Sequence, residues 1–404
     1  MNIKATNSNL NKTFWIFLIW LVMMACITTP AATPAPIASP APLPQMQIQL
    51  RDATGWNWYA IPIPIIKPAS QDGPQMIIDS KGRINLFWDT YAGSRNAFIY
   101  YSIFDAGQWT IPTPIAQTLG ISQISRSTPV ATSDGAIHVL WYNQLKLGGP
   151  YRLMYAKYDG TNWSSEVELY RSGDLNINGS LFSDTHSIVH AIIKAPNDLL
   201  YLTNTVNGWQ NQQSIVPKGF GNLVLWKYEP DSAGDVRLYG IDLSTSGQLD
   251  YAYWQNGVVT AQKTNITLKP YDYDFGDNLG NYYIYSTGDV PIPGGTTTGA
   301  YYQCIDNHLT LWPQQLLSGA ATVITKPQIS RSASRTVMSW LTNDNQVQFL
   351  FPKGCGEADL FELPLPKVQF QRQPLSLAIS DSPNKLCILN KVLSDVEIYC
   401  ADMP

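Results

Sequence analysis

The sequence predicts an all-β protein: a seven-bladed β-propeller of four-stranded antiparallel blades, closed by an outer strand from the N-terminal part of the chain. Three observations predict it. Only 14% of the 404 residues are charged, whereas 12% are aromatic, and Gly and Pro number 28 each; this composition is typical of short strands joined by many turns. A turn-and-strand motif recurs about every 50 residues. The last repeat lacks an outer strand, and a strand-like segment precedes the first repeat.

Each repeat consists of a turn and then a strand of alternating apolar residues. The clearest copies are residues 79–88 (DSKGRINLFW) and 133–141 (SDGAIHVLW). The turn positions of all seven copies are Gly82, Gly135, Ser187, Gly234, Gly280, Ser334 and Asn384. A period of this length, with several strands in each unit, is typical of propeller blades.

The first repeat shows how the strands divide and where the ends of the chain meet. Its four strands are expected at residues 74–78, 84–88, 98–104 and 109–115. The seventh repeat reaches the end of the sequence before a fourth strand, while residues 51–65 are similar to residues 105–115. We therefore predict that residues 51–65 supply the missing outer strand, with residues 56–63 paired to residues 395–400. This pairing would remove an exposed sheet edge.

The first 26 residues have the pattern of an export signal. Lys4 and Lys12 precede an apolar run that ends at Ala25, and Cys26 follows directly. This arrangement resembles a bacterial lipoprotein signal, which implies lipidation of Cys26 as the mature N-terminus. The alternatives are an uncleaved membrane anchor, although the run is shorter than the roughly 20 residues that span a bilayer, and ordinary cleavage with secretion. All three place the following chain outside the cytoplasm, anchored to the membrane at the cell surface or secreted.

The rest of the chain divides into a tether and a propeller. Residues 27–46 include six prolines between Pro30 and Pro44, so we expect a disordered, extended tether there. Residues 47–404 are the expected propeller. Membrane contact is expected through the N-terminal anchor alone, and the net charge of −4 argues against nucleic acid as a partner.

The remaining four cysteines lie in the C-terminal part of the sequence, where export would permit disulfides. An antiparallel hairpin in the last repeat places Cys387 opposite Cys400, so they are expected to form a bridge or to be two buried thiols. Cys304 and Cys355 end equivalent strands of adjacent repeats and are the second expected pair. The cysteine spacings include no CxxC, and neither a metal site nor a cofactor is expected.

The repeat motif resembles the sialidase-like, or neuraminidase-repeat-like, propellers of exported bacterial proteins, over residues 51–404. The resemblance implies the propeller fold. The sialidase Asp-box (Ser-x-Asp-x-Gly-x-x-Trp) is not matched, Ala60 stands where the Arg-Ile-Pro signature has Arg, and no two acids fall in corresponding loops as glycosidases require. The first hypothesis is therefore a non-catalytic binding module for a glycan or a protein partner. The alternatives are a sialidase-like glycoside hydrolase or lyase with a diverged site, and a structural scaffold of an envelope assembly.

Candidate ligand-binding residues lie near the variable connections between the second and third strands, because variable loops on a rigid scaffold commonly carry binding sites. They are Trp88, Arg95, Arg126, Trp141 and Arg152. Aromatic faces stack on sugar rings and Arg holds carboxylates by paired hydrogen bonds, which together would suit an acidic glycan. Alternatively, the Trp side chains pack between blades and the Arg side chains are solvated.

Two repeated polar positions are interpreted as architectural. His138 and His190 occupy the repeat position that Asn85 holds in the first copy. An acidic residue recurs before the turn and is expected to cap the turn with its side chain; its copies are Asp79, Asp184, Asp231, Asp277 and Asp381.

Overall fold

The computed structural model describes most of the unit that runs from Pro44 to Pro404. The described residues are 47–63, 74–92, 96–119, 124–144, 149–173, 177–184, 186–195, 198–215, 223–230, 236–242, 248–255, 258–267, 273–278, 281–292, 295–306, 312–317, 328–332, 335–342, 346–364, 376–381, 383–392 and 395–403. The expected signal, Cys26 and the tether lie outside them. No helix in this described part of the chain has the length and apolar character needed to cross a membrane.

Strands form seven sheets, numbered here in chain order. The first three contain β3 (Gln75–Ile78), β4 (Ile84–Ala92), β5 (Asn96–Asp105), β6 (Gln108–Trp109) and β7 (Thr113–Leu119); β8 (Ile124–Ala131), β9 (Ile137–Gln144), β10 (Tyr151–Tyr158) and β11 (Val167–Ser172); and β12 (Asn178–Ser183), β13 (Val189–Ala195), β14 (Asp198–Thr205) and β15 (Gly208–Ser214). Apart from β1, described below, neighbouring strands within each sheet pair antiparallel, as predicted.

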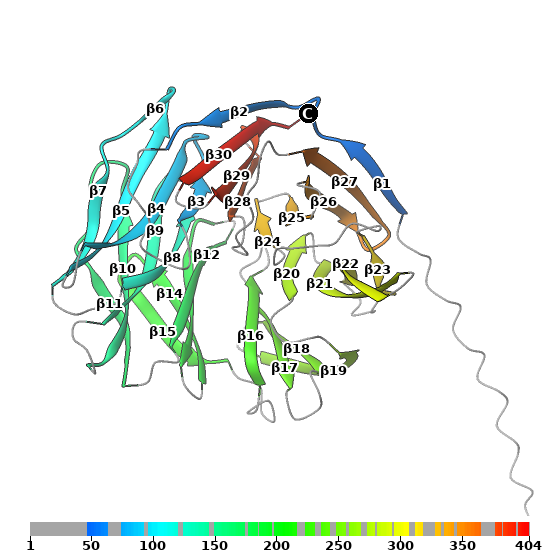
Figure 1. The fold of residues 1–404 in the computed structure, drawn as a ribbon. Helices are drawn as coiled ribbons and strands as arrows, with labels where there is room; N and C mark the ends of the chain where they lie inside the picture. The colour runs from blue at the N-terminus through cyan, green and yellow to red at the C-terminus, as the bar shows by residue number, and fades with distance from the viewer. Residues whose placement is uncertain are drawn as a thin grey trace, which may run out of the picture. The chain divides into compact units, whose positions relative to one another are not determined.

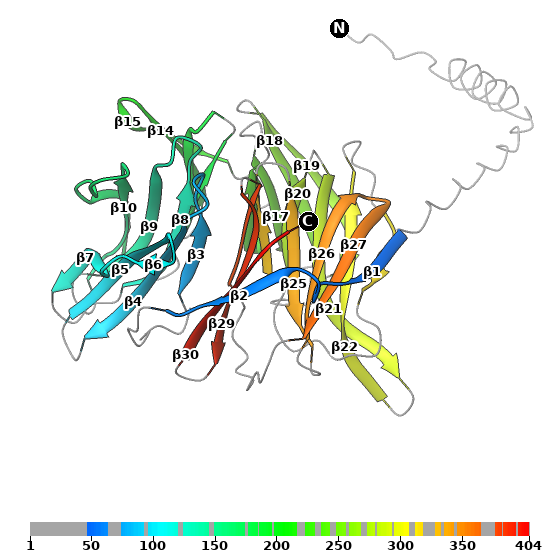
Figure 2. The ribbon, with the colours of Figure 1, turned by 90° about the horizontal axis from the view of Figure 1, so that it is seen from above.

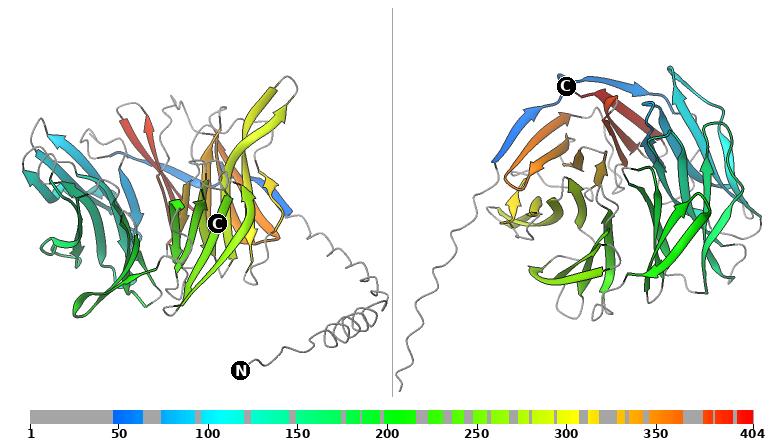
Figure 3. Two further views of the ribbon diagram at one scale, coloured as in Figure 1. Left: turned by 90° about the horizontal axis from the view of Figure 1, so that it is seen from below. Right: turned by 180° about the vertical axis from the view of Figure 1, so that it is seen from behind.

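The other four sheets repeat this order. They contain β16 (Leu223–Pro230), β17 (Val236–Asp242), β18 (Gln248–Gln255) and β19 (Val258–Thr267); β20 (Tyr273–Asn278), β21 (Asn281–Ile292), β22 (Gly295–Ile305) and β23 (Gln315–Leu316); β24 (Gln328–Arg331), β25 (Thr336–Leu341), β26 (Gln346–Gly354) and β27 (Glu357–Pro364); and β28 (Ser376–Asp381), β29 (Asn384–Val392) and β30 (Asp395–Asp402). β21 and β22 are longer than most strands, and the hairpin that they form extends beyond its neighbours (Figure 2, Figure 3).

Neighbouring sheets pack through their first strands. These strands contact one another in the order β16, β20, β24, β28, β3, β8 and β12, and Figure 1 shows them toward the middle of the unit, with the later strands outside. Among the described residues, buried apolar clusters lie between sheets 5 and 6, 6 and 7, 7 and 1, 1 and 2, and 2 and 3; one of them joins Phe87 and Tyr101 of sheet 1 to Trp141 and Met154 of sheet 2. Sheets 6, 7, 1 and 2 are therefore covered on both faces.

The N-terminal part of the chain completes sheet 7, as the sequence predicts. β2 (Asn57–Ile61) pairs antiparallel with β30, with Tyr59 opposite Cys400. The preceding strand was not predicted: β1 (Gln47–Asp52) pairs parallel with β27 and gives sheet 6 a fifth strand. The expectation of four antiparallel strands in every blade is wrong here, because β1 covers the edge of β27 that would otherwise stay open.

The corner between β1 and β2 is fixed by a small buried cluster. The Ala53 amide donates to the Glu362 carbonyl at 3.0 Å, and Trp58 Nε1 donates to the Ala53 carbonyl at 2.8 Å. The Trp56 ring lies against those of Trp58 and Phe361, with centroids 5.9 and 4.8 Å apart. The segment is thus anchored to sheet 6 before it enters sheet 7.

Both expected disulfides are present. Cys387 and Cys400 are directly opposed on β29 and β30 and form one bridge. Cys304 of β22 bonds to Cys355, which follows β26, and this bridge links sheets 5 and 6. Such bonds form and persist outside the cytoplasm, in agreement with the expected export of the protein.

A polar row crosses the second, third and fourth strands of sheet 6. Trp340 Nε1 donates to Gln348 Oε1 at 2.7 Å, and Gln348 Nε2 donates to Glu362 Oε1. These residues are directly opposed across β25, β26 and β27. The equivalent row of sheet 2 is Trp141, Met154 and Glu168, where the thioether is only a weak acceptor and Trp141 Nε1 is buried without a partner. One side chain thus decides whether the row is connected.

We predict that Gln348→Met, which copies the sheet 2 residue into sheet 6, will lower the free energy of unfolding by about 1–3 kcal/mol. The substitution removes the acceptor of a fully buried indole N–H. Urea denaturation followed by Trp fluorescence measures the effect. Gln346→Met on the same strand is the control, and equal stability losses in the two variants would contradict the role of the row.

Candidate functional site

One polar position near the start of the second strand is conserved in geometry across sheets 1, 2 and 3. In each case a side chain of that strand bonds to a tyrosine hydroxyl on the third strand: Asn85 Oδ1 with Tyr101 at 2.9 Å, His138 Nδ1 with Tyr155 at 2.7 Å, and His190 Nδ1 with Tyr201 at 2.7 Å. All six side chains are buried. The architectural interpretation of His138 and His190 is confirmed, since each supplies an acceptor to a buried hydroxyl.

The partners of Tyr155 determine the protonation of His138. Asn204 Nδ2 of sheet 3 donates to the Tyr155 hydroxyl oxygen at 2.9 Å, so this hydroxyl donates its own proton to His138 Nδ1. The imidazole is therefore neutral with its proton on Nε2. Burial lowers the pKa of His138 to about 4 from its ordinary value of 6.5, because the charged form would lose its hydration.

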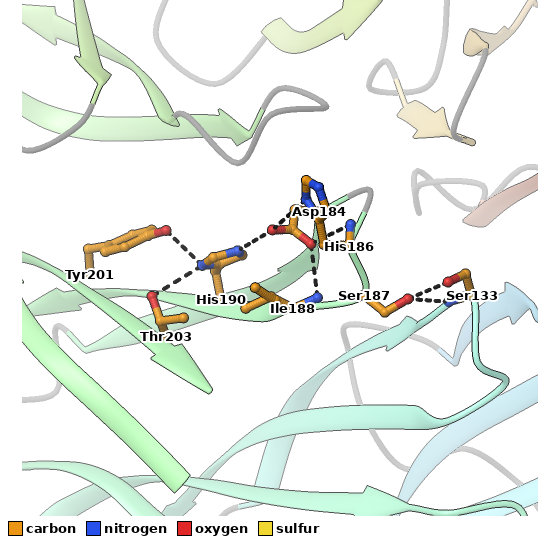
Figure 4. Close-up of polar contacts among 8 residues, drawn as sticks. All are labelled: Ser133, Asp184, His186, Ser187, Ile188, His190, Tyr201 and Thr203. Atoms are coloured by element: carbon orange, nitrogen blue, oxygen red, sulfur yellow. Dashed lines mark hydrogen bonds and ion pairs between the residues drawn. The ribbon is translucent and has the colours of Figure 1, made fainter. Parts of the chain in front are cut away.

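His190 lies between a tyrosine and a carboxylate (Figure 4). Its Nε2 is 3.4 Å from Asp184 Oδ2, and Nδ1 also lies 3.3 Å from Thr203 Oγ1. Burial lowers the pKa of His190, and the Asp184 carboxylate opposes this shift. Although the order Asp–His–Tyr is that of a proton relay, His190 and Tyr201 are only 6% and 5% exposed. The arrangement holds strands together and presents no reactive atom to a substrate.

The acidic residue of this cluster also caps its turn, as predicted. Asp184 Oδ1 accepts from the amides of His186 and Ile188 at 2.8 and 2.9 Å, and Asp79 Oδ1 caps the first turn in the same way.

The turn residue of sheet 3, Ser187, adopts a φ of +63°, whereas the turns of sheets 1 and 2 have Gly82 and Gly135 at this position. The Ser187 hydroxyl bonds to Ser133 of sheet 2 (Figure 4). Asp381 instead accepts from Ser332 and Arg335 of the preceding sheet. The side chains of Asp231 and Asp277 are not described.

The expected aromatic shelf is wrong. Trp88 is 4% exposed and Trp141 is fully buried, because each indole lies in a core between adjacent sheets. Trp88 packs between sheets 7 and 1, and Trp141 between sheets 1 and 2. Neither ring can stack on a sugar, and the packing alternative accounts for both.

Two of the three candidate arginines, Arg126 and Arg152, lie on strands rather than in loops. Arg95 lies outside the described residues. Arg126 belongs to β8, where Arg126 and Ser127 form a bulge opposite Trp141; its side chain is not described. Arg152 lies near the start of β10, directly opposite Asn143 of β9. The structure thus brings Arg126, Trp141 and Arg152 to the same end of sheet 2.

Arg152 is held at the edge of the core with few acceptors. Its side chain is 13% exposed. Nη2 lies 3.4 Å from Asn143 Oδ1, Nη1 lies 3.5 Å from Glu168 Oε2, and Nε is buried without a hydrogen-bond partner. A guanidinium has five N–H donors in a fixed plane, so two long contacts leave this one with unused capacity for an anion.

Glu168 is shared between two arginines. Arg171 donates from Nε and Nη2 to its two oxygens at 2.8 and 2.7 Å, which is the paired geometry of a strong ion pair. These hydrogen bonds lower the pKa of Glu168. Residues three apart on a regular strand face opposite sides, but a bulge at Leu169 puts Glu168, Arg171 and Arg152 on one face.

The sequence indicated Arg152 as a candidate ligand-binding residue, which stays a prediction, and it did not single out Glu168 or Asn143. The position of Glu168 relative to Arg152 depends on the bulge in β11, which no residue type identifies in advance. Asn143 is directly opposite Arg152 in the regular pairing of β9 with β10. Among the described residues, no group of three metal-ligating side chains has the geometry of a metal site.

We predict that His138→Asn will flatten the pH dependence of stability. The unfolded chain binds a proton at His138 as the pH falls through 6.5, whereas the folded protein does so only near 4, so wild-type stability declines across that window by about 3 kcal/mol from this residue. Asn85 shows that asparagine can accept from the equivalent tyrosine. Urea unfolding at pH 7.5, 6, 5 and 4 measures it. His186→Asn, at a 77% exposed side chain, is the control; identical slopes for His138→Asn and wild type would refute the assignment.

Comparison with known proteins shows the fold. The sequence matches no protein-family profile and no curated protein. The polysaccharide lyase Uly1 is similar in structure, with a TM-score of 0.53, 10% identity, and coverage of 85% of this chain and 92% of the lyase. The β-propeller domain of the Trilobed protease from Pyrococcus furiosus has a TM-score of 0.50, 9% identity and coverages of 81% and 92%. The NanB sialidase of Streptococcus pneumoniae overlaps with a TM-score of 0.43, 10% identity and coverages of 76% and 70%. The chain therefore has a β-propeller fold, similar to the propeller domain of the Trilobed protease and to the polysaccharide lyase Uly1.

Proposed function

We propose that this protein is an extracytoplasmic binding module that holds an acidic polysaccharide through Arg152 without cleaving it. The single observation that supports this most is the state of the Arg152 guanidinium: it is mostly buried, and among the described residues its contacts with acceptors are long, at 3.4 and 3.5 Å. A carboxylate of a uronic acid would complete its hydrogen bonds in the paired geometry that arginine prefers.

The propeller and the N-terminal segment would present this site outside the cytoplasm. The seven sheets would be seven blades, with β12 and β16 adjacent and the pairing of β2 with β30 closing the propeller. Cys26 would be lipidated, and residues 27–46 would hold the domain away from the membrane. Arg126 would add a second cation, because its bulge lies opposite Trp141, in the strand next to β9.

Two other functions predict different experimental outcomes. A glycoside hydrolase or lyase of sialidase-like fold needs an acid or base that reaches the substrate, and the Asp184–His190–Tyr201 arrangement is buried. A purely structural scaffold needs no saccharide ligand. Shortening of a bound oligosaccharide would support the enzyme, and absence of binding to any acidic glycan would support the scaffold.

The first test is calorimetric titration of the full chain with oligogalacturonate, using its methyl ester as the uncharged control. We expect binding of the acid form alone, weakening as salt rises, and an unchanged oligosaccharide length by mass spectrometry. Equal affinity for acid and ester would contradict the proposal.

The residue test is Arg152→Gln. Loss of a charged hydrogen-bonding partner should weaken binding about 10- to 100-fold, corresponding to roughly 1.5–3 kcal/mol. Arg51→Gln, which removes an arginine paired with Asp359 on sheet 6, is the matched control and should bind like wild type. Thermal unfolding of both variants separates loss of the site from loss of the fold.

A further inference from the structure

Glu168 occupies the same position in sheet 2 that Glu362 occupies in sheet 6. Each is directly opposite the third-strand residue of the Trp row. In sheet 6, Gln348 binds the carboxylate and ties it to the sheet. In sheet 2, Met154 has no donor for the carboxylate, and Glu168 instead contacts Arg171 and Arg152.

The two arginines hold this carboxylate unequally. Arg171 binds both oxygens at 2.8 and 2.7 Å, whereas Arg152 reaches one oxygen at 3.5 Å. Arg171 is 56% exposed and Arg152 only 13%. The carboxylate is therefore drawn toward the solvent side of the cluster and away from the buried guanidinium. It is also the same chemical group that the proposed ligand would bring to Arg152.

From this geometry we propose that Glu168 is an internal competitor for the Arg152 site, and that Arg171 restrains it so that Arg152 stays open to a ligand carboxylate. The proposal rests on the function proposed above and adds what regulates affinity at that site. Glu168 repels a ligand carboxylate and would pair with Arg152 itself if released. Arg171 does not contact the ligand; it acts through Glu168 as a positioning residue.

The consequences form a double-mutant cycle. Glu168→Gln removes the competing charge and should tighten binding of oligogalacturonate about tenfold. Arg171→Ala releases Glu168 onto Arg152 and should weaken binding about tenfold. In the Glu168→Gln background, Arg171→Ala should have no effect, because there is no charge left to restrain.

Calorimetry tests these affinities for oligogalacturonate in the full-length wild type, both single variants and the double variant. Equal affinities of Glu168→Gln and wild type would overturn the competitor role. A loss on Arg171→Ala that persists in the Glu168→Gln background would overturn the restraint, since Arg171 would then bind the ligand directly.

A structural measurement tests the restraint without any saccharide. In a crystal structure of Arg171→Ala, the contact between Arg152 and Glu168 should shorten from 3.5 Å to about 2.8 Å, the usual length of a charged hydrogen bond. An unchanged contact would overturn the proposal even if polysaccharide binds. If the contact shortens and none of the four proteins binds an acidic saccharide, the restraint stands and the proposed function fails.

Discussion

The pairing of β2 with β30 is the interaction on which the rest of the structure depends. Sheet 7 has only three strands of its own, so its outer edge would be open without Asn57–Ile61. Residues 53–61, which contain β2, contribute to the cores on both sides of sheet 7. Ala53, Trp56 and Trp58 pack into the cluster between sheets 6 and 7, and Ile61 packs into the cluster between sheets 7 and 1. Hydrogen bonding and burial therefore act together to join residues that are more than 330 positions apart in the chain.

The covalent and polar links are concentrated in the same region. One disulfide ties sheet 5 to sheet 6 and the other staples β29 to β30, while Arg335 of sheet 6 reaches Asp381 and Asn384 of sheet 7. The two disulfides join residues 51 and 13 positions apart, and such cross-links limit the unfolded chain more than the folded one. The Arg335 hydrogen bonds act in the folded protein alone. In sheets 1, 2 and 3, buried Tyr–Asn and Tyr–His pairs link the second and third strands within each sheet, and Asn204 and Ser187 of sheet 3 bond to Tyr155 and Ser133 of sheet 2.

The seven repeats solve the same packing problem with different chemistry, and the differences are where function can arise. Asn85, His138 and His190 all accept from a tyrosine hydroxyl at one position, so substitution there keeps the architecture and changes only its response to pH. At the Trp row the substitution has a larger consequence. With Gln348 the row is connected across sheet 6, whereas with Met154 the carboxylate of Glu168 is available for Arg152 and Arg171.

The sequence by itself predicted the period, the four-strand order, an outer strand within residues 51–65, Cys387–Cys400 and Cys304–Cys355 as the candidate cysteine pairs, and the architectural role of His138 and His190; the structure shows that both pairs are bridges. These predictions follow from local patterns and from counting along a hairpin, because period and register are properties of the chain. The sequence could not place Trp88 and Trp141, since both lie in the middle of longer strands than predicted, β4 and β9, where the neighbouring sheet covers the indole. It also could not find β1, whose partner lies about 300 residues away, or the Arg152–Glu168–Arg171 cluster. Only the tertiary structure decided these, because a single bulge at Leu169 reverses which face of β11 meets Arg152.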